Sequence, residues 1–248
     1  MGVKCRRGGS MKDSISRFID KLAAYEGSDT VFNPWRDYDP ALDVSQAAPQ
    51  WRREQLESYL RARLKQSRYL IVAEAVGYQG GRFSGIAITC ERMLLGFHND
   101  VKPAMILPDG IGKRTSRADS PLLLNNKQRL EGFNEPTDTV VWSALLENNI
   151  STYDAILWNI FPFHPHVANQ PLTNRTPTET EIVIGGQFTE DLMALIEAYN
   201  GDRQIICAVG RKSADILARQ GIVAHALRHP ANGGAKQYRE QFKAAIER

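Results

Sequence analysis

The chain has 248 residues, of which 42% are hydrophobic and 24% charged, and this composition suits one large globular domain. No run of residues reaches the roughly 18 apolar positions that a membrane span needs, and no apolar stretch follows the basic start of the chain. We therefore expect neither membrane insertion nor secretion, and a cytoplasmic protein. The formal net charge of +3 permits a polyanionic partner without requiring one.

The cysteine content points to a reduced compartment. Cys5, Cys90 and Cys207 are an odd number without close pairs, which argues against a disulfide framework and against a four-cysteine zinc or iron-sulfur site. Residues 1–10 are basic and precede the first helix-like stretch, so we expect them to form a disordered extension. Residues 11–248 are expected to form a single domain.

Positive charge is concentrated in two stretches of the chain. Residues 51–68 hold six Lys or Arg against two Glu, and residues 102–129 hold six against two Asp. Either stretch can be a contact for a nucleic acid, or merely a solvated helix or loop surface. Residues 98–134 are also irregular and rich in proline and glycine, which is typical of a functional loop.

Apolar segments alternate with segments of helical spacing along the chain. The apolar segments, which predict short buried strands, are residues 69–76, 153–159, 204–209 and 222–227. The segments of helical spacing are residues 50–65, 137–149, 189–199, 211–219 and 235 to the C-terminus. This order predicts an α/β fold, a three-layer α/β/α sandwich with a central, mostly parallel four-stranded sheet, which binds ligands beyond the carboxyl ends of its strands.

The first candidate site segment, residues 73–85, follows the first predicted strand. It is rich in glycine and alanine and carries a carboxylate, Glu74, at the strand end. Small residues allow the backbone to approach a ligand closely. The segment lacks the spacing of a dinucleotide fingerprint and the Gly-Lys-Ser/Thr end of a phosphate loop. It therefore indicates either an active-site loop of another kind or a tight strand-to-helix turn.

Two further strand ends carry polar side chains. Asn159 ends the second predicted strand, and an amide there can match the carbonyl and N–H edge of a pyrimidine. His164 and His166 follow without a third ligand nearby, so we expect rim or surface histidines and no zinc site. His229 follows the fourth strand, before a glycine-rich loop and a basic helix.

Together these segments resemble the motifs of the uracil-DNA glycosylase superfamily, in the same order and on the same strands. Residues 73–77, Ala-Glu-Ala-Val-Gly, are similar to the Gly-Glu-Ala-Pro-Gly turn of the iron-sulfur branch, and residues 81–85 resemble the Gly-Arg-x-Phe-x-Gly that follows it. Asn159 matches the base-reading asparagine, residues 174–177 the Asn-Arg-x-Pro beyond it, and residues 229–230 the His-Pro motif. Residues 209–214 resemble the small-residue turn before that last motif. The resemblance covers residues 69–243.

The chain departs from this pattern at several positions. Ala73 and Val76 replace the Gly and Pro of the first motif, residues 231–234 replace the commoner Ser-Pro after His-Pro, and the cluster-binding cysteines are absent. The branch therefore stays unassigned. These departures surround the base pocket. The resemblance therefore says least about which base is removed.

The resemblance implies a monofunctional DNA glycosylase, which flips a target base and hydrolyses its N-glycosidic bond to leave an abasic site. Glu74 would stabilise the sugar cation and activate water, and His229 would stabilise negative charge on the departing base. Asn159 would read the edge of the base and Phe83 would stack on its face. Ala75 and Gly77 would complete the base-binding site, and backbone N–H groups at residues 75–77 would add an oxyanion contact.

The DNA contacts implied by the resemblance lie mainly after the last strand. The loop from Asn232 to Gln237, which includes Gly233 and Gly234, would press into the duplex, and Lys236 and Arg239 would lie near phosphates. Arg82 would add a further contact to DNA. No cofactor, metal or Schiff-base lysine is required, and the protein is expected to act on DNA as a monomer.

Several alternatives remain open at this point. Uracil is the first expected base, but hypoxanthine or a hypermodified phage cytosine, removed in antiviral defence, is an alternative. A non-catalytic DNA-binding relative and a nucleotide-binding α/β protein are others. Each residue also has an ordinary structural explanation: Glu74 as a paired carboxylate, Phe83 as a core aromatic, Asn159 as a turn former and His229 as a strand-end cap.

Overall fold

The computed structural model describes residues 10–123, 125–201 and 204–247. The helices of these residues are α1 (Met11–Ala24), α2 (Ala48–Arg63), α3 (Gly81–Ser84), α4 (Glu91–Leu94), α5 (Asn126–Glu131), α6 (Pro136–Glu147), α7 (Glu179–Asn200), α8 (Arg211–Arg219) and α9 (Ala235–Ile246), with short 3-10 turns at Pro103–Met105 and Thr152–Asp154. The strands are β1 (Val31–Phe32), β2 (Tyr69–Ala75), β3 (Ala155–Phe161), β4 (His164–Pro165), β5 (Ile205–Val209) and β6 (His225–Leu227).

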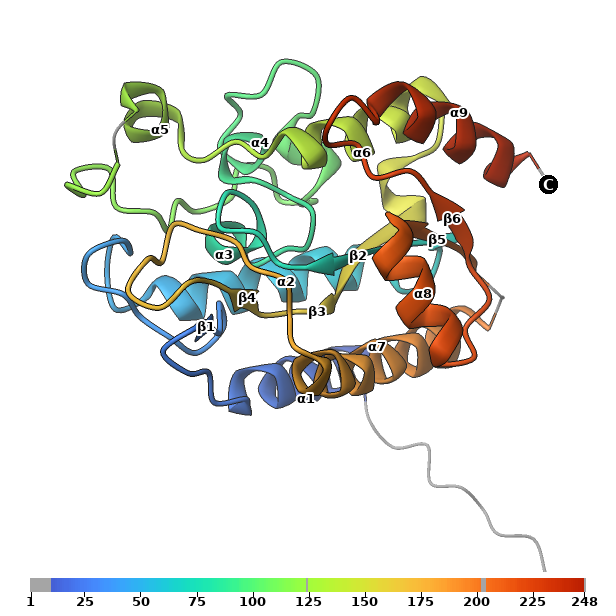
Figure 1. The fold of residues 1–248 in the computed structure, drawn as a ribbon, viewed down its shortest axis with the longest axis horizontal. Helices are drawn as coiled ribbons and strands as arrows, with labels where there is room; N and C mark the ends of the chain where they lie inside the picture. The colour runs from blue at the N-terminus through green and yellow to red at the C-terminus, as the bar shows by residue number, and fades with distance from the viewer. Residues whose placement is uncertain (1–9, 124, 202–203, 248) are drawn as a thin grey trace, which may run out of the picture.

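The central sheet has four strands in the order β3-β2-β5-β6, and every pair in it is parallel. The buried, β-branched and aromatic residues of β2 and β3 suit strands that are covered on both faces. All four carboxyl ends therefore meet at one edge, as Figure 1 shows. The expected α/β fold with a central parallel four-stranded sheet is confirmed.

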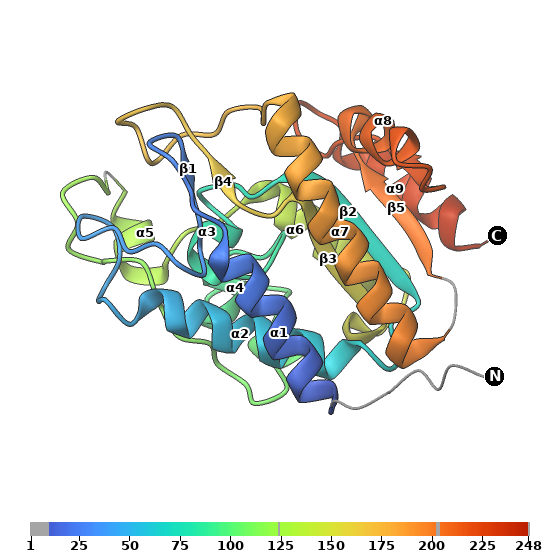
Figure 2. The same ribbon diagram turned by 90° about the horizontal axis from the view of Figure 1, so that it is seen from below.

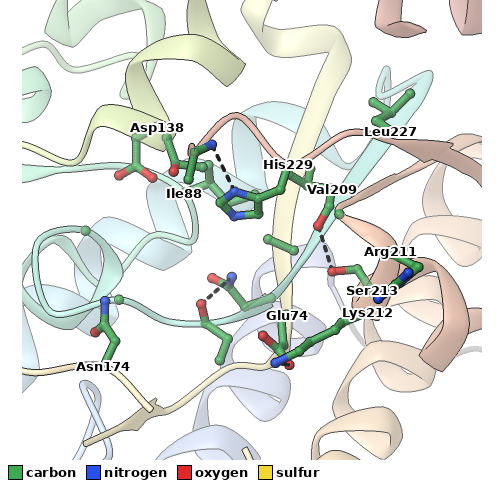
Figure 3. A pocket seen from close by; sticks show the side chains of 18 of the residues that line it. Glu74, Ile88, Asp138, Asn174, Val209, Arg211, Lys212, Ser213, Leu227 and His229 are labelled. Carbon is green, nitrogen blue, oxygen red and sulfur yellow. Dashed lines mark hydrogen bonds and ion pairs between the residues drawn. The ribbon is translucent and has the colours of Figure 1, made fainter. Parts of the chain in front are cut away.

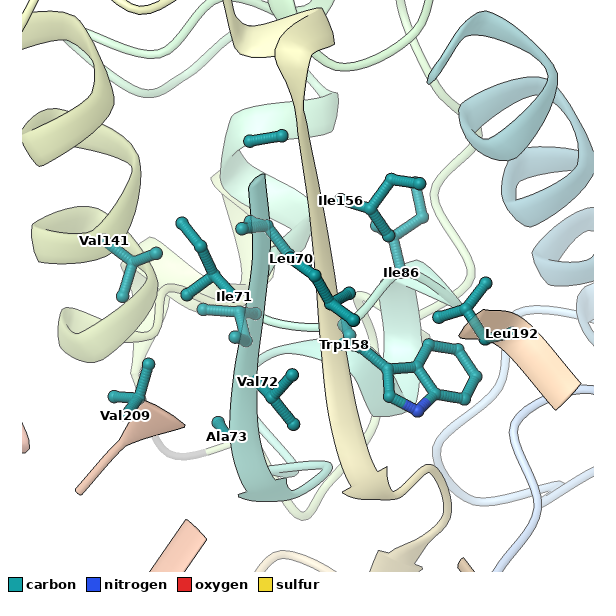
Figure 4. Packing of buried hydrophobic residues seen from close by; sticks show 14 of the residues in the cluster. Leu70, Ile71, Val72, Ala73, Ile86, Val141, Ile156, Trp158, Leu192 and Val209 are labelled. Atoms are coloured by element: carbon teal, nitrogen blue, oxygen red, sulfur yellow. The ribbon is translucent and has the colours of Figure 1, made fainter. Parts of the chain in front are cut away.

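Helices cover both faces of this sheet. Helices α6 and α9 pack together on one side, whereas α7 packs against β3 and α8 against β5 and β6 on the other. Figure 2 shows α1 lying alongside α7. In Figure 4, Val141 of α6 and Leu192 of α7 lie on opposite sides of β2 and β3, and both side chains are completely buried. These contacts define the three layers.

The bounds of several elements differ from those expected. Strand β3 continues to Phe161, so Asn159 lies inside the strand and not at its tip. Helix α7 begins at Glu179, ten residues before the expected start at position 189. Ser10, expected to belong to the extension, caps α1 through a reciprocal pair of hydrogen bonds with Asp13. The rest of that extension lies outside the described residues.

The segment between α1 and α2 is held by buried charges. Asp43 and Arg52 form an ion pair with 2.6 Å between Oδ1 and Nη2, and both side chains are fully buried. Buried ion pairs of this kind are costly to break because the remaining charge has no partner.

Among the described residues, no helix is long and apolar enough to cross a membrane.

Candidate active site

A cavity of about 1020 Å³ opens at the carboxyl edge of the sheet (Figure 3). Residues after or near the end of each strand line it, and the start of α6 adds further side chains. Its lining includes Glu74, Ala75, Gly77, Gly80, Glu135, Asp138, Asn159, Asn174, Gly210, Lys212, Ser213, Asp215, His229 and Asn232. The cavity therefore brings together the expected Glu74, Asn159 and His229, which come from β2, β3 and the loop after β6.

Glu74 lies near the end of β2, with its side chain 28% exposed. Its Oε1 is 3.4 Å from Nζ of Lys212, which stands in the first turn of α8. Figure 3 shows the two side chains side by side in the cavity. Lys212 was not among the expected site residues. Its position directly after the turn that follows a strand is the sequence feature that could have indicated a place in the site. The pair keeps a carboxylate within reach of both water and ligand.

Asn159 presents an acceptor to the cavity. Its Nδ2 donates to the carbonyl oxygen of Ala75 at 2.9 Å, and this bond fixes which end of the amide faces the neighbouring strand. Its Oδ1 is buried and has no hydrogen-bond partner among the described residues. The side chain is 3% exposed, so an unpaired acceptor at this depth is suited to a ligand N–H group.

His229 is held in one tautomer. Its Nδ1 accepts from the backbone N–H of Ala231 at 3.1 Å, so the neutral ring carries its proton on Nε2. Burial, and then the charge of Arg228, lower the pKa of His229, which favours the neutral form. A Cβ at Gly210, whose φ is +89°, would lie 3.3 Å from the His229 Cβ. Glycine thus allows the ring to sit against the turn after β5, with Nε2–H as a donor.

Phe83 does not line this cavity, which corrects the expectation that it stacks on a base. Its side chain is completely buried and its ring lies parallel to that of Phe133, 4.5 Å away. The two rings belong to a small cluster with Leu42 and Leu123. Phe83 is therefore a core aromatic, which was the alternative to a base-stacking role. The short helix α3 turns its ring away from the strand ends.

Arg82 is also unavailable to DNA. It is completely buried, its guanidinium lies 3.8 Å above the Phe32 ring, and Nη2 donates to Asp39 at 3.1 Å. Its Nη1 lies 3.3 Å from Nδ1 of His164. His164 and His166 are themselves buried, so neither is the rim or surface histidine that was expected.

The loop after β6 divides the expected DNA-binding residues. Asn232 and Gly233 are exposed and have positive φ values, and the Lys236 side chain is 87% exposed. Gly234 is buried, with its Cα against the carbonyl oxygen of His229. Arg239 donates from Nε to Glu147 at 2.9 Å. The loop tip and Lys236 can meet a duplex directly, whereas Gly234 supports the loop from below and Arg239 has a partner within the protein.

The backbone at the end of β2 is partly engaged. The Val76 N–H donates to the carbonyl oxygen of Phe161 at 3.3 Å, so it is not free to bind an oxyanion. Asn174, which was expected only as part of a motif, accepts from the Tyr78 N–H at 3.0 Å and lines the cavity beside Gly77.

Two carboxyl groups at the start of α6 were missed by the sequence analysis. Glu135 and Asp138 line the cavity, and Asp138 is 3% exposed. Burial raises the pKa of both groups. The pKa of Asp138 is raised well above its usual range, and the charge of Glu135 is the second cause. The helical spacing of the sequence does not indicate that these two residues reach the cavity, because the loop before α6 brings them to the sheet edge.

Asp138→Asn is expected to stabilise the protein, and more so at high pH. The folded state keeps a proton on Asp138 above the usual carboxyl pKa of 3.8, where the unfolded chain has released it, so stability is lost as pH rises through the raised pKa. Melting curves should show Tm raised by about 2 °C or more at pH 8, and by less at pH 5. Asp215→Asn, at an exposed carboxylate of the same cavity, is the control. An equal effect of both substitutions at both pH values would contradict the prediction.

Comparisons with known proteins place the fold. No protein-family model and no curated protein sequence matches the chain. Among solved structures, it is similar to the crystal structure of wild-type SMUG2 from Pedobacter heparinus. The TM-score is 0.60, with 16% sequence identity over 96% of this chain and 97% of that chain. The chain thus shares the fold of this structure over nearly its whole length.

Proposed function

We propose that the protein is a DNA glycosylase that hydrolyses the bond between a base and its deoxyribose. The observation that carries this proposal is the convergence of Glu74, Asn159 and His229 on one cavity. They offer a carboxylate for positive charge on the sugar, an unpaired acceptor for the edge of the base and an N–H donor for negative charge on the departing base. The fold shared with SMUG2 supports the same class of activity.

In the proposed reaction, the C1′–N bond breaks and its electron pair leaves with the base. Positive charge then develops on the sugar, where the Glu74 carboxylate stabilises it and orients a water molecule. The water oxygen forms the new bond to C1′, and its proton passes to Glu74 or to solvent. Nε2–H of His229 donates to the base oxygen on which negative charge accumulates.

Asn159 would select the base before the bond breaks. Its Oδ1 accepts from a ring N–H group, as in uracil or hypoxanthine, and the bond from Nδ2 to Ala75 holds the amide in that orientation. Gly77 leaves room beside the base, and the exposed tip at Asn232 and Gly233 would occupy the space that the flipped nucleotide leaves. Lys212 and Lys236 would lie near phosphates.

Base release can be tested with duplexes that carry uracil, hypoxanthine or a modified cytosine at one position. We expect strand breaks at that position after alkali treatment and none without it, because an abasic site is formed and no Schiff base is needed. Binding to DNA without release from any duplex would instead favour a non-catalytic DNA-binding protein. Tight binding of ATP or NAD without DNA binding would favour the nucleotide-binding alternative.

A further inference from the structure

The cavity has an acidic wall that the reaction described above does not use. Glu135 and Asp138 form it, and Oδ2 of Asp138 is buried with no hydrogen-bond partner in the part of the chain that the structure describes. Within residues 10–123, 125–201 and 204–247, no lysine, arginine or histidine forms an ion pair with either carboxyl group. An unsatisfied buried polar group destabilises the folded protein, so its presence in a binding cavity indicates that a ligand supplies the missing partner.

Two glycines leave this wall uncovered. A Cβ at Gly77 would lie 3.4 Å from Oε2 of Glu135, and one at Gly80 would lie 2.8 Å from Oδ2 of Asp138. Gly77 does not have a positive φ, so its backbone conformation does not demand glycine. The lack of side chains at these two positions therefore lets the backbone lie close to both carboxyl groups in the wall of the cavity beyond the end of β2.

A separate observation also points to a ligand that brings hydrogen-bond donors. Oδ1 of Asn159, on a different strand, is a second buried acceptor without a partner among the described residues. The cavity has a volume of about 1020 Å³, at the upper end of the range for pockets that bind drug-sized ligands. Such ligands are much larger than a pyrimidine ring. The pocket thus has both the room and the acceptors for a base larger and richer in donors than uracil.

We propose that Glu135 and Asp138 select a base that carries an exocyclic hydrogen-bond donor, either an amino group or a hydroxyl-bearing substituent, over uracil. A carboxyl group keeps an acceptor oxygen whether or not it is protonated, so it can receive an N–H or O–H in either state. Uracil adds only carbonyl oxygens and C–H groups beyond its ring N–H. A site built around a substrate's polar group discriminates strongly against analogues that lack it.

This inference rests on the proposed glycosylase function, and a matched set of substrates separates the two. Single-turnover excision is measured on identical duplexes with uracil, 5-hydroxymethyluracil or 5-hydroxymethylcytosine at one position. These bases offer no exocyclic donor, a hydroxyl group, and a hydroxyl with an amino group. We expect at least one donor-bearing base to leave at least about tenfold faster than uracil. If 5-hydroxymethyluracil is excised faster than uracil, the hydroxyl group makes the contact. If only 5-hydroxymethylcytosine is excised faster, the amino group is required.

Apolar variants of similar size test the residues themselves. Glu135→Met and Asp138→Leu remove the acceptors, and each is expected to reduce the preference over uracil by about tenfold. Glu54→Gln, at a partly exposed carboxylate that does not line the cavity, should leave the preference unchanged. Gly77→Leu keeps both acids but covers Glu135, and it should reduce the preference without altering either carboxyl group.

The possible failures are distinct. Release of uracil at least as fast as both donor-bearing bases overturns the inference and leaves the glycosylase function in place. A preference that survives both Glu135→Met and Asp138→Leu, in variants with folded circular dichroism spectra, also overturns it. Release of no base from any duplex overturns the glycosylase function, and the inference with it.

Discussion

Glu74→Gln is expected to lower the single-turnover rate of base release about 10- to 1000-fold, the range for loss of one charge-stabilising group. The amide keeps the shape of the side chain but cannot balance positive charge on the sugar or accept a proton from water. Loss of the ion pair with Lys212 should change stability little, because both side chains are partly exposed. The rate is measured with the base that the wild-type protein releases fastest.

The chain provides a matched control for this substitution. Glu54 forms a similar ion pair with Lys113, 2.8 Å apart, and neither residue lines the cavity. Glu54→Gln should therefore leave the rate unchanged. DNA affinity, measured by fluorescence anisotropy, should be retained in both variants. Equal rates for Glu74→Gln and the wild-type protein would remove Glu74 from the proposed reaction.

Arg63→Met is expected to reduce the free energy of unfolding by about 3 to 5 kcal/mol. The guanidinium of Arg63 is fully buried and donates to the backbone carbonyl oxygens of Tyr59, Met105, Ile106, Thr152 and Ala155, at 2.8 to 3.2 Å. It thereby ties α2 to the loop near position 105 and to the start of β3. Methionine fills the space but leaves these acceptors without their donor.

Urea unfolding, followed by tryptophan fluorescence, measures this loss. Arg61→Met is the control, because Arg61 lies in the same helix but is exposed and forms an ion pair with Glu57 one turn away. Its effect should stay within about 0.5 kcal/mol. Similar losses in the two variants would show that the buried guanidinium does not hold these segments together.

Much of the fold could be predicted from the sequence where local signals agree with the tertiary structure. Helix α8 begins and ends where its spacing predicts, since a glycine with positive φ precedes it and a glycine follows shortly after it. Helix α7 shows the opposite case. Gly185 and Gly186 lower its helical propensity, yet a Cβ at either would collide with the Ile160 carbonyl or with Gln220. Close packing against β3 explains Gly185, and the side chain of Gln220 at the end of α8 lies against Gly186; only the tertiary structure reveals these contacts.

The site could be predicted only in part for the same reason. Glu74 and His229 follow from their strands, because parallel strands bring their carboxyl ends to one edge. The orientation of Phe83 depends on Phe133, some fifty residues further along the chain, which provides the ring that covers it. Glu135 and Asp138 reach the cavity through the path of an irregular loop, and no period in the sequence encodes that path.

The placement of Asn159 has a consequence for how binding energy is used. The residue lies within β3, the edge strand beside β2, and the Ala75 carbonyl oxygen of β2 already restrains its amide. Little side-chain freedom is then left to lose when a ligand arrives, so each hydrogen bond made to Oδ1 contributes almost its full strength to affinity. Recognition at this position is accordingly preorganised and does not require a segment to become ordered, and a detached base could remain bound through the same contact after its sugar has left.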